Sequence, residues 1–130
     1  MPPIRPERAR NLLSATDRAP QRSRRPLSLR QGALLALIAA GLTAHEIANL
    51  QASAITMELG HLLVAVRRHG VTWEACLPAD LAPHLLAWLS ERRLWGEPAP
   101  VFTGRQGRLT PTAVYQALHR YRQKQRNPRG

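Results

Sequence analysis

Arginine is the most abundant chemically active side chain in this sequence, and it gathers at the two ends of the chain. The 130 residues carry 19 Lys and Arg against 8 Asp and Glu, which gives a formal net charge of +11. Residues 1–30 hold eight Arg and two acids, residues 103–130 hold six Arg, one Lys and no acid, and the middle is slightly acidic. Cations that contact a nucleic-acid backbone release condensed counterions, so this distribution favours double-stranded DNA as the partner. Basic ends that only keep the chain in solution are the alternative.

The candidate phosphate contacts fall into four groups along the chain. They lie in the N-terminal arm, beside a predicted hairpin turn, in a Gly-rich loop and on the last predicted helix. For each of them a solvated surface charge is the alternative. No base-reading residue is assigned, because base recognition depends on groove geometry. The candidates are Arg22, Arg24, Arg25, Arg67, Arg68, Arg105, Arg108, Arg120, Arg122, Lys124 and Arg126.

Metal, cofactor and thiol chemistry are not indicated. The single cysteine, Cys76, excludes an internal disulfide and a thiolate zinc cluster, and the five His lack a paired metal spacing. We expect Cys76 to be a small buried hydrophobic residue in a strand. The sequence therefore predicts no metal site and no cofactor.

The apolar run from Gly32 to Leu42 is 11 residues long, whereas a membrane span needs roughly 20. No membrane role is expected. Arg24 and Arg25, inside Ser23–Leu27, are similar to a twin-arginine export signal, but no clear A-x-A cleavage site follows. We expect a cytoplasmic, nucleoid-associated protein.

The order of predicted elements indicates an α+β domain that is mainly helical. Residues 1–26 are rich in Pro and Arg and predict a flexible basic arm, in which we expect a turn of helix around Ala9–Ser14 to form on binding. One domain follows over residues 27–130, with a basic C-terminal helix and tail. Ser28 is an N-cap for a helix that runs to Ala40 and ends at Gly41. Thr43 and Glu46 form a capping box that starts a second helix.

The segment from Ile55 to Leu77 fits both a strand and a helix pattern. Gly60, the Arg68–Gly70 turn and the β-favouring residues after it favour two or three short antiparallel strands. A third helix is predicted from Pro78 to about Arg93, followed by a Val101–Phe102 apolar anchor. The Gly-rich loop covers Thr103–Arg108, and Thr110–Pro111 start a last helix to about Gln125.

This order resembles the catalytic domain of the tyrosine recombinases, the phage-integrase family. The family's first box, G-L-R-x-x-E-x-x-x-L-x-W-S-D-I, is similar to the run from Gly41 to Ile55 without a gap. His61–Leu77 resembles the family's β-hairpin, Leu77–Pro78 its "VPL", and Leu81–Arg93 its next helix. Val101–Phe102 with Leu109–Arg120 is similar to the "LF…G…LS…V…L" segment. The resemblance covers roughly residues 27–125.

The resemblance implies DNA binding without catalysis. The first catalytic arginine position is Thr43, whose hydroxyl cannot supply a permanent forked charge, and Arg67 or Arg68 stands where the family has a lysine. The family's second box and nucleophilic tyrosine have no counterpart before Gly130. Tyr115 and Tyr121 fall inside the last predicted helix and are expected to pack or to contact DNA. We therefore expect no enzyme, but a regulator or accessory factor of a mobile genetic element, with a full-length recombinase or a second copy of this chain as further partners.

A second resemblance leads to a different regulator. Gly41–Ala48, His61–Leu62 and Arg67–Val71 are similar to the helix-turn-helix domain of quorum-sensing and response-regulator activators. That reading requires a continuous helix from Ser53 to Arg68, with Gly60 inside it at a cost of about 1 kcal/mol relative to Ala.

Overall fold

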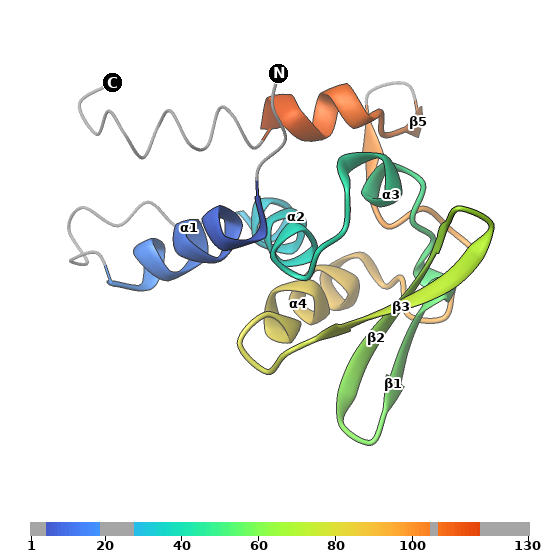
Figure 1. Cartoon of the computed structure of the whole chain (residues 1–130), viewed down its shortest axis with the longest axis horizontal. Helices are drawn as coiled ribbons and strands as arrows, with labels where there is room; N and C mark the ends of the chain where they lie inside the picture. Colours follow the sequence, from blue (N-terminus) through green and yellow to red (C-terminus); the bar gives the residue numbers. More distant parts are fainter. Residues whose placement is uncertain (1–4, 19–27, 105–106, 118–130) are drawn as a thin grey trace.

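The computed structural model describes residues 5–18, 28–104 and 107–117, and these form an α+β structure with one small three-stranded sheet (Figure 1). The α+β class predicted from the sequence is confirmed. A last helical segment covers residues 111–117. The other elements, in chain order, are α1 (Pro6–Arg18), α2 (Leu29–Ala39), α3 (Ala44–Ala48), the 3-10 turn η1 (Ala52–Ala54), β1 (Ile55–Glu58), β2 (His61–Arg68), β3 (Val71–Leu77), α4 (Ala82–Arg92), β4 (Thr103–Gly104) and β5 (Gly107–Arg108).

Helix α2 is the centre of the hydrophobic core. All residues from Gly32 to Ile38 are buried, because α1 and α4 pack on it. Its start is fixed by a capping box, in which the Ser28 hydroxyl accepts a hydrogen bond from the Gln31 backbone and the Gln31 side chain accepts one from Ser28. The chain leaves the helix at Gly41, whose φ of +104° suits glycine. The predicted Ser28 cap and the Gly41 stop are both confirmed.

Helix α1 differs from the prediction of a flexible arm, which is wrong for Pro6–Arg18. Ala9 and Leu13, four residues apart, are buried in the common core, and Leu12 packs against it. Arg10 also pairs with Asp80, just ahead of α4. The segment is rich in Arg, but it also carries a short apolar stripe. The helix is stable only because α2 covers this stripe. The rest of the predicted arm, residues 1–4 and 19–26, lies outside the described residues.

The segment that fitted two patterns forms an antiparallel sheet in the order β1-β2-β3. Thr56 lies opposite Leu63 and Val66 lies opposite Trp73, and the strands are joined by two-residue turns at Leu59–Gly60 and His69–Gly70. The predicted hairpin is confirmed. The continuous helix from Ser53 to Arg68 that the helix-turn-helix reading requires does not form.

One face of the sheet closes the core and the other is open to solvent. Val64, Ala75 and Leu77 are buried on the inner face. Cys76 lies between two of these residues and is exposed, so the expectation that it is buried is wrong. Successive side chains of a strand point to opposite faces, and the short polar-apolar pattern of β3 did not reveal which face Cys76 would take.

The third predicted helix begins at Ala82, four residues later than expected. Pro78 starts a turn instead, because the Leu81 and Ala82 amides donate to its carbonyl oxygen. Leu85 and Leu89 then bury one side of α4, and the helix ends at Arg93, whose φ is +53°. Among the described residues, no helix is long and apolar enough to cross a membrane.

The chain after α4 is anchored by the predicted apolar pair. Val101 and Phe102 are buried, Phe102 stacks on Trp88, and the Trp88 indole donates to the Val101 carbonyl at 2.8 Å. The expected loop over Thr103–Arg108 contains a short antiparallel pair instead, β4 with β5. The Thr110 hydroxyl accepts from the Ala113 amide, which confirms the predicted start of the last helix.

Candidate nucleic-acid interface

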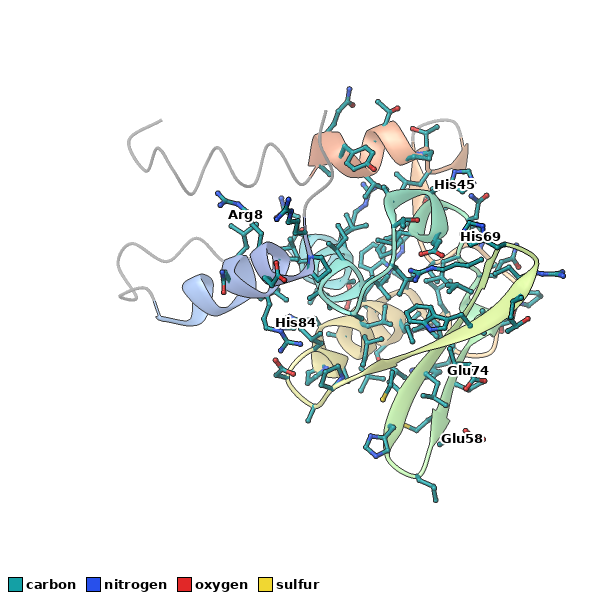
Figure 2. The ribbon with its side chains drawn as sticks, in the orientation of Figure 1. Arg8, His45, Glu58, His69, Glu74 and His84 are labelled. Atoms are coloured by element: carbon teal, nitrogen blue, oxygen red, sulfur yellow. The ribbon has the colours of Figure 1, made fainter. Side chains whose placement is uncertain are left out.

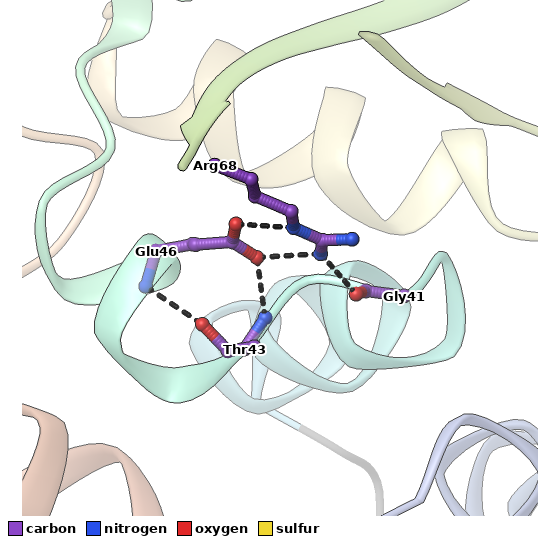
Figure 3. Close-up of polar contacts among 4 residues, drawn as sticks. All are labelled: Gly41, Thr43, Glu46 and Arg68. Atoms are coloured by element: carbon purple, nitrogen blue, oxygen red, sulfur yellow. Dashed lines mark hydrogen bonds and ion pairs between the residues drawn. The ribbon is translucent and has the colours of Figure 1, made fainter. Parts of the chain in front are cut away.

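Thr43 acts as the cap of α3. Its hydroxyl accepts a hydrogen bond from the Glu46 amide at 3.2 Å, and Glu46 Oε1 accepts one from the Thr43 amide at 2.8 Å (Figure 3). This capping box is the one predicted from the sequence. The Thr43 side chain is therefore engaged in positioning the backbone, which is the role a hydroxyl can fill and a guanidinium cannot.

Arg68, at the end of β2, binds the same carboxylate. Its Nε donates to Glu46 Oε2 at 2.5 Å, and its Nη2 donates to Glu46 Oε1 at 2.6 Å and to the Gly41 carbonyl at 2.7 Å (Figure 3). The guanidinium also lies 4.1 Å from the centre of the Trp73 ring. These contacts connect the hairpin turn with the connection between α2 and α3.

The electrostatics of this cluster follow from the ion pair. The hydrogen bonds from Arg68 are the main cause that holds the pKa of Glu46 below its ordinary value, and those from Glu46 raise the pKa of Arg68. Both groups are charged at neutral pH, and their charges largely cancel. Only a third of the Arg68 side chain is exposed. The structure thus holds this candidate phosphate contact as an internal partner of Glu46, a bond between residues 22 positions apart that no local pattern predicted.

Arg67, the neighbouring candidate, points to the opposite face of the sheet and is exposed. Its guanidinium has only a long contact, 3.5 Å, with the Gly70 carbonyl. It lies at the rim of a pocket of about 350 Å³ between α3 and β2. The pocket is lined by His45, Glu46, Asn49, Leu50, Gln51, Ala54, Ala65, Val66 and Arg67.

The structure describes few of the other predicted contacts. Arg108 is in β5, and only its backbone is described. Eight further candidates lie outside the described residues and stay predictions, and Tyr121 lies outside them as well. The eight are Arg22, Arg24, Arg25, Arg105, Arg120, Arg122, Lys124 and Arg126.

Sequence reasoning missed two cations at the start of α1. Arg5 and Arg8 are exposed beside the buried stripe of the helix, and Figure 2 labels Arg8 on the outer side of α1. The amphipathic spacing of Ala9 and Leu13 was the available signal, since Arg8 lies beside the face that this spacing buries and not on it.

The described elements at the two basic ends include α1 and the helix at residues 111–117. In Figure 1, α1 lies at the left and the helix at residues 111–117 lies at the top, whereas the β1–β2 turn is at the bottom. Both elements lie away from that turn in this view.

The described residues offer little for covalent or metal chemistry. Tyr115 is half-buried and packs against the core. No group of three His, Cys, Asp or Glu gathers as a metal site within residues 5–18, 28–104 and 107–117.

Comparison of the chain with protein-family models gave no match, and comparison with the curated proteins gave none either.

Proposed function

We propose that this chain binds duplex DNA through the phosphate backbone and does not cleave it, as a regulator or accessory factor of a mobile genetic element. The observation that supports this most is the arrangement of charge. The cations are concentrated in residues 1–30 and 103–130, while the residues between them are slightly acidic. Basic ends with an excess of cations suit a linear polyanion. Such a protein would work at the nucleoid.

We also propose that the domain has the architecture of a tyrosine-recombinase catalytic domain. Thr43 and Arg68, the positions that the resemblance assigns to catalytic cations, share the carboxylate of Glu46 although they are far apart in sequence. If the chain shares the architecture of the recombinase domain, these two positions must lie close together in space. The sheet also agrees with the hairpin that the resemblance implies.

The same cluster supports the loss of catalysis. Strand cleavage needs several free donors around the reacting phosphate, and removal of one such donor typically costs about 10²- to 10³-fold in rate. Here the threonine caps a helix and Arg68 is neutralised by Glu46. Thr43 carries no charge and the charge of Arg68 is paired, so neither position supplies a free cation.

DNA binding is tested by its salt dependence. Fluorescence anisotropy with a labelled duplex, measured over a salt series, is expected to give a log–log slope of about −0.9 for each phosphate contact, or roughly −5 for six contacts. Binding that does not change with salt concentration would contradict the proposed DNA binding. Tight binding to a recombinase with no retention on DNA would instead favour a protein-interaction module.

Lack of cleavage is tested with nicked suicide substrates, which trap a covalent protein–DNA adduct when a tyrosine attacks. We expect no adduct. An adduct that disappears in the Tyr115→Phe or Tyr121→Phe variant would show that the chain is an enzyme.

A further inference from the structure

The two hairpin turns of the sheet have the same backbone and different residues. Leu59 and Gly60 have φ of +50° and +80°, and His69 and Gly70 have φ of +53° and +78°. Two-residue turns with positive φ at both positions favour Asn-Gly and Asp-Gly, because asparagine and aspartate tolerate the left-handed region. Leucine is unfavourable there.

Leu59 is also the most exposed large hydrophobic residue described, with 99% of its surface in contact with solvent. The adjacent Met57 is about half exposed. An apolar side chain in a strained conformation at the end of a hairpin adds nothing to the fold of its own chain. Such a placement points to a contact with another molecule.

A pocket with an apolar lining lies at the other end of β2. Strand β1 begins opposite Val64, so residues 65–68 of β2 have β3 on one side and no strand on the other. The pocket of about 350 Å³ described above occupies this gap, and Leu50, Ala54 and Val66 form its apolar lining. It is large enough to receive a leucine side chain.

The charges at the two places are complementary. Glu58 precedes Leu59 and is exposed, and Arg67 lies at the rim of the pocket. Among the described residues, neither of them has an ion-pair partner. The pocket's own carboxylate, Glu46, is already paired with Arg68.

Leu59 cannot reach the pocket of its own chain. Six residues of strand lie between Gly60 and Arg67, so the two are roughly 23 Å apart at about 3.3 Å per residue. Figure 2 likewise shows Glu58 at the far end of the sheet from His45, which lines the pocket. The occupant must come from another molecule.

We propose that Leu59 of one copy inserts into the α3–β2 pocket of a second copy, with Glu58 of the first paired with Arg67 of the second. The contact joins two different surfaces, so each copy keeps one free tip and one free pocket. Such head-to-tail contacts continue into chains or rings. The surface is small, so the association is weak and appears at high protein concentration.

Sedimentation of the full chain without DNA tests this assembly. The average mass is expected to rise with concentration past that of a dimer, and to fall again when salt screens the Glu58–Arg67 pair. Leu59→Asn should abolish the rise and should fold normally, because asparagine suits this turn. His69→Asn makes the same change in the matching turn and should leave association unchanged. A chain that stays monomeric, one that stops at the dimer, or a Leu59→Asn variant that still associates would overturn the proposal.

Charge variants test the pairing and its direction. Glu58→Arg alone and Arg67→Glu alone should each weaken association at least tenfold, and the double variant should regain it. Leu59→Asn has an intact pocket and Arg67→Glu has an intact tip, so a mixture of the two should form a heterodimer and nothing larger. Failure of the double variant to regain association, or larger assemblies in the mixture, would contradict the contact. These measurements contain no DNA, so their outcome is independent of the proposed DNA binding.

Discussion

The carboxylate of Glu46 makes two kinds of contact. It closes the capping box with Thr43 and holds Arg68 at the end of β2. Its side chain is about 10% exposed, so its charge is mostly removed from water and needs the guanidinium beside it.

The Glu46→Gln substitution separates these two contacts. Glutamine can still close the capping box, as Gln31 does at the start of α2, but it carries no charge for Arg68. We expect a loss of about 1–2 kcal/mol in the free energy of unfolding, and a larger loss for Glu46→Ala, which removes both contacts. Urea denaturation measures this. Equal losses for the two variants would mean that the ion pair contributes nothing.

The pH dependence of stability follows from the lowered pKa of Glu46. In the folded state its pKa lies below the ordinary value of 4.5, so the unfolded chain binds the proton more readily. The stabilisation from Glu46 is present above pH 4.5 and is lost as the pH falls through the folded pKa. The pH profile of the unfolding midpoint should therefore fall less on the acid side for Glu46→Gln than for the original chain. Parallel profiles for the two proteins would contradict this.

At the scale of the elements, α1 completes the core. Leu13 is 4% exposed and packs in the cluster that α2 centres. A helix of this length is marginal by itself in water, so the contact with α2 accounts for its presence.

Leu13→Ala is expected to cost about 2–3 kcal/mol of unfolding free energy, because it leaves a cavity against α2. The matched control is Asn11→Ala on the exposed side of the same helix, which should change stability by less than about 0.5 kcal/mol. Thermal unfolding of both variants measures the difference. Two variants of equal stability would show that α1 does not contribute to the core.

The elements that were predicted correctly have local signals. Ser28, Gly41 and Thr43 fix helix ends through neighbours within about four residues, and the hairpin turns are marked by Gly60 and Gly70. Features that depend on distant contacts were missed or misplaced. The helical state of α1 depends on α2, and the exposure of Cys76 depends on which sheet face the core covers.

The candidate site was predictable in part for the same reason. The Thr43 cap is local and was expected. The engagement of Arg68 was not, since it depends on a sheet register that brings β2 beside α3. Residue type alone predicted the same role for Arg67 and Arg68. Because successive side chains of a strand point to opposite faces, Arg67 points to solvent and Arg68 points to Glu46.

At the scale of the whole molecule, charge decides where a polyanion would lie. Arg5 and Arg8 are exposed at the start of α1, within the basic stretch of residues 1–30. Arg92 and Arg93 are at the end of α4 that is opposite the Arg10–Asp80 pair.

If DNA follows the α1 side, Arg5→Ala with Arg8→Ala should reduce the salt slope of DNA binding by roughly 2, or about 0.9 for each lost contact. The control, Arg92→Ala with Arg93→Gly, removes the same charge from the distant end of α4 and should leave the slope unchanged. Glycine suits the left-handed backbone at Arg93. Equal reductions in both double variants would indicate a general charge effect and no defined DNA-binding side.

The Glu46–Arg68 bond also has a consequence for the dynamics of the molecule. It joins residues 22 positions apart and so closes a loop that contains the second half of α3, β1 and β2, as a non-covalent crosslink would. Segments tied in this way open together instead of fraying one at a time. Amide hydrogens of α3, a helix of only five residues, should therefore exchange with solvent at the same opening free energy as those at the end of β2. In Glu46→Gln the two segments should separate into an early and a late exchanging group.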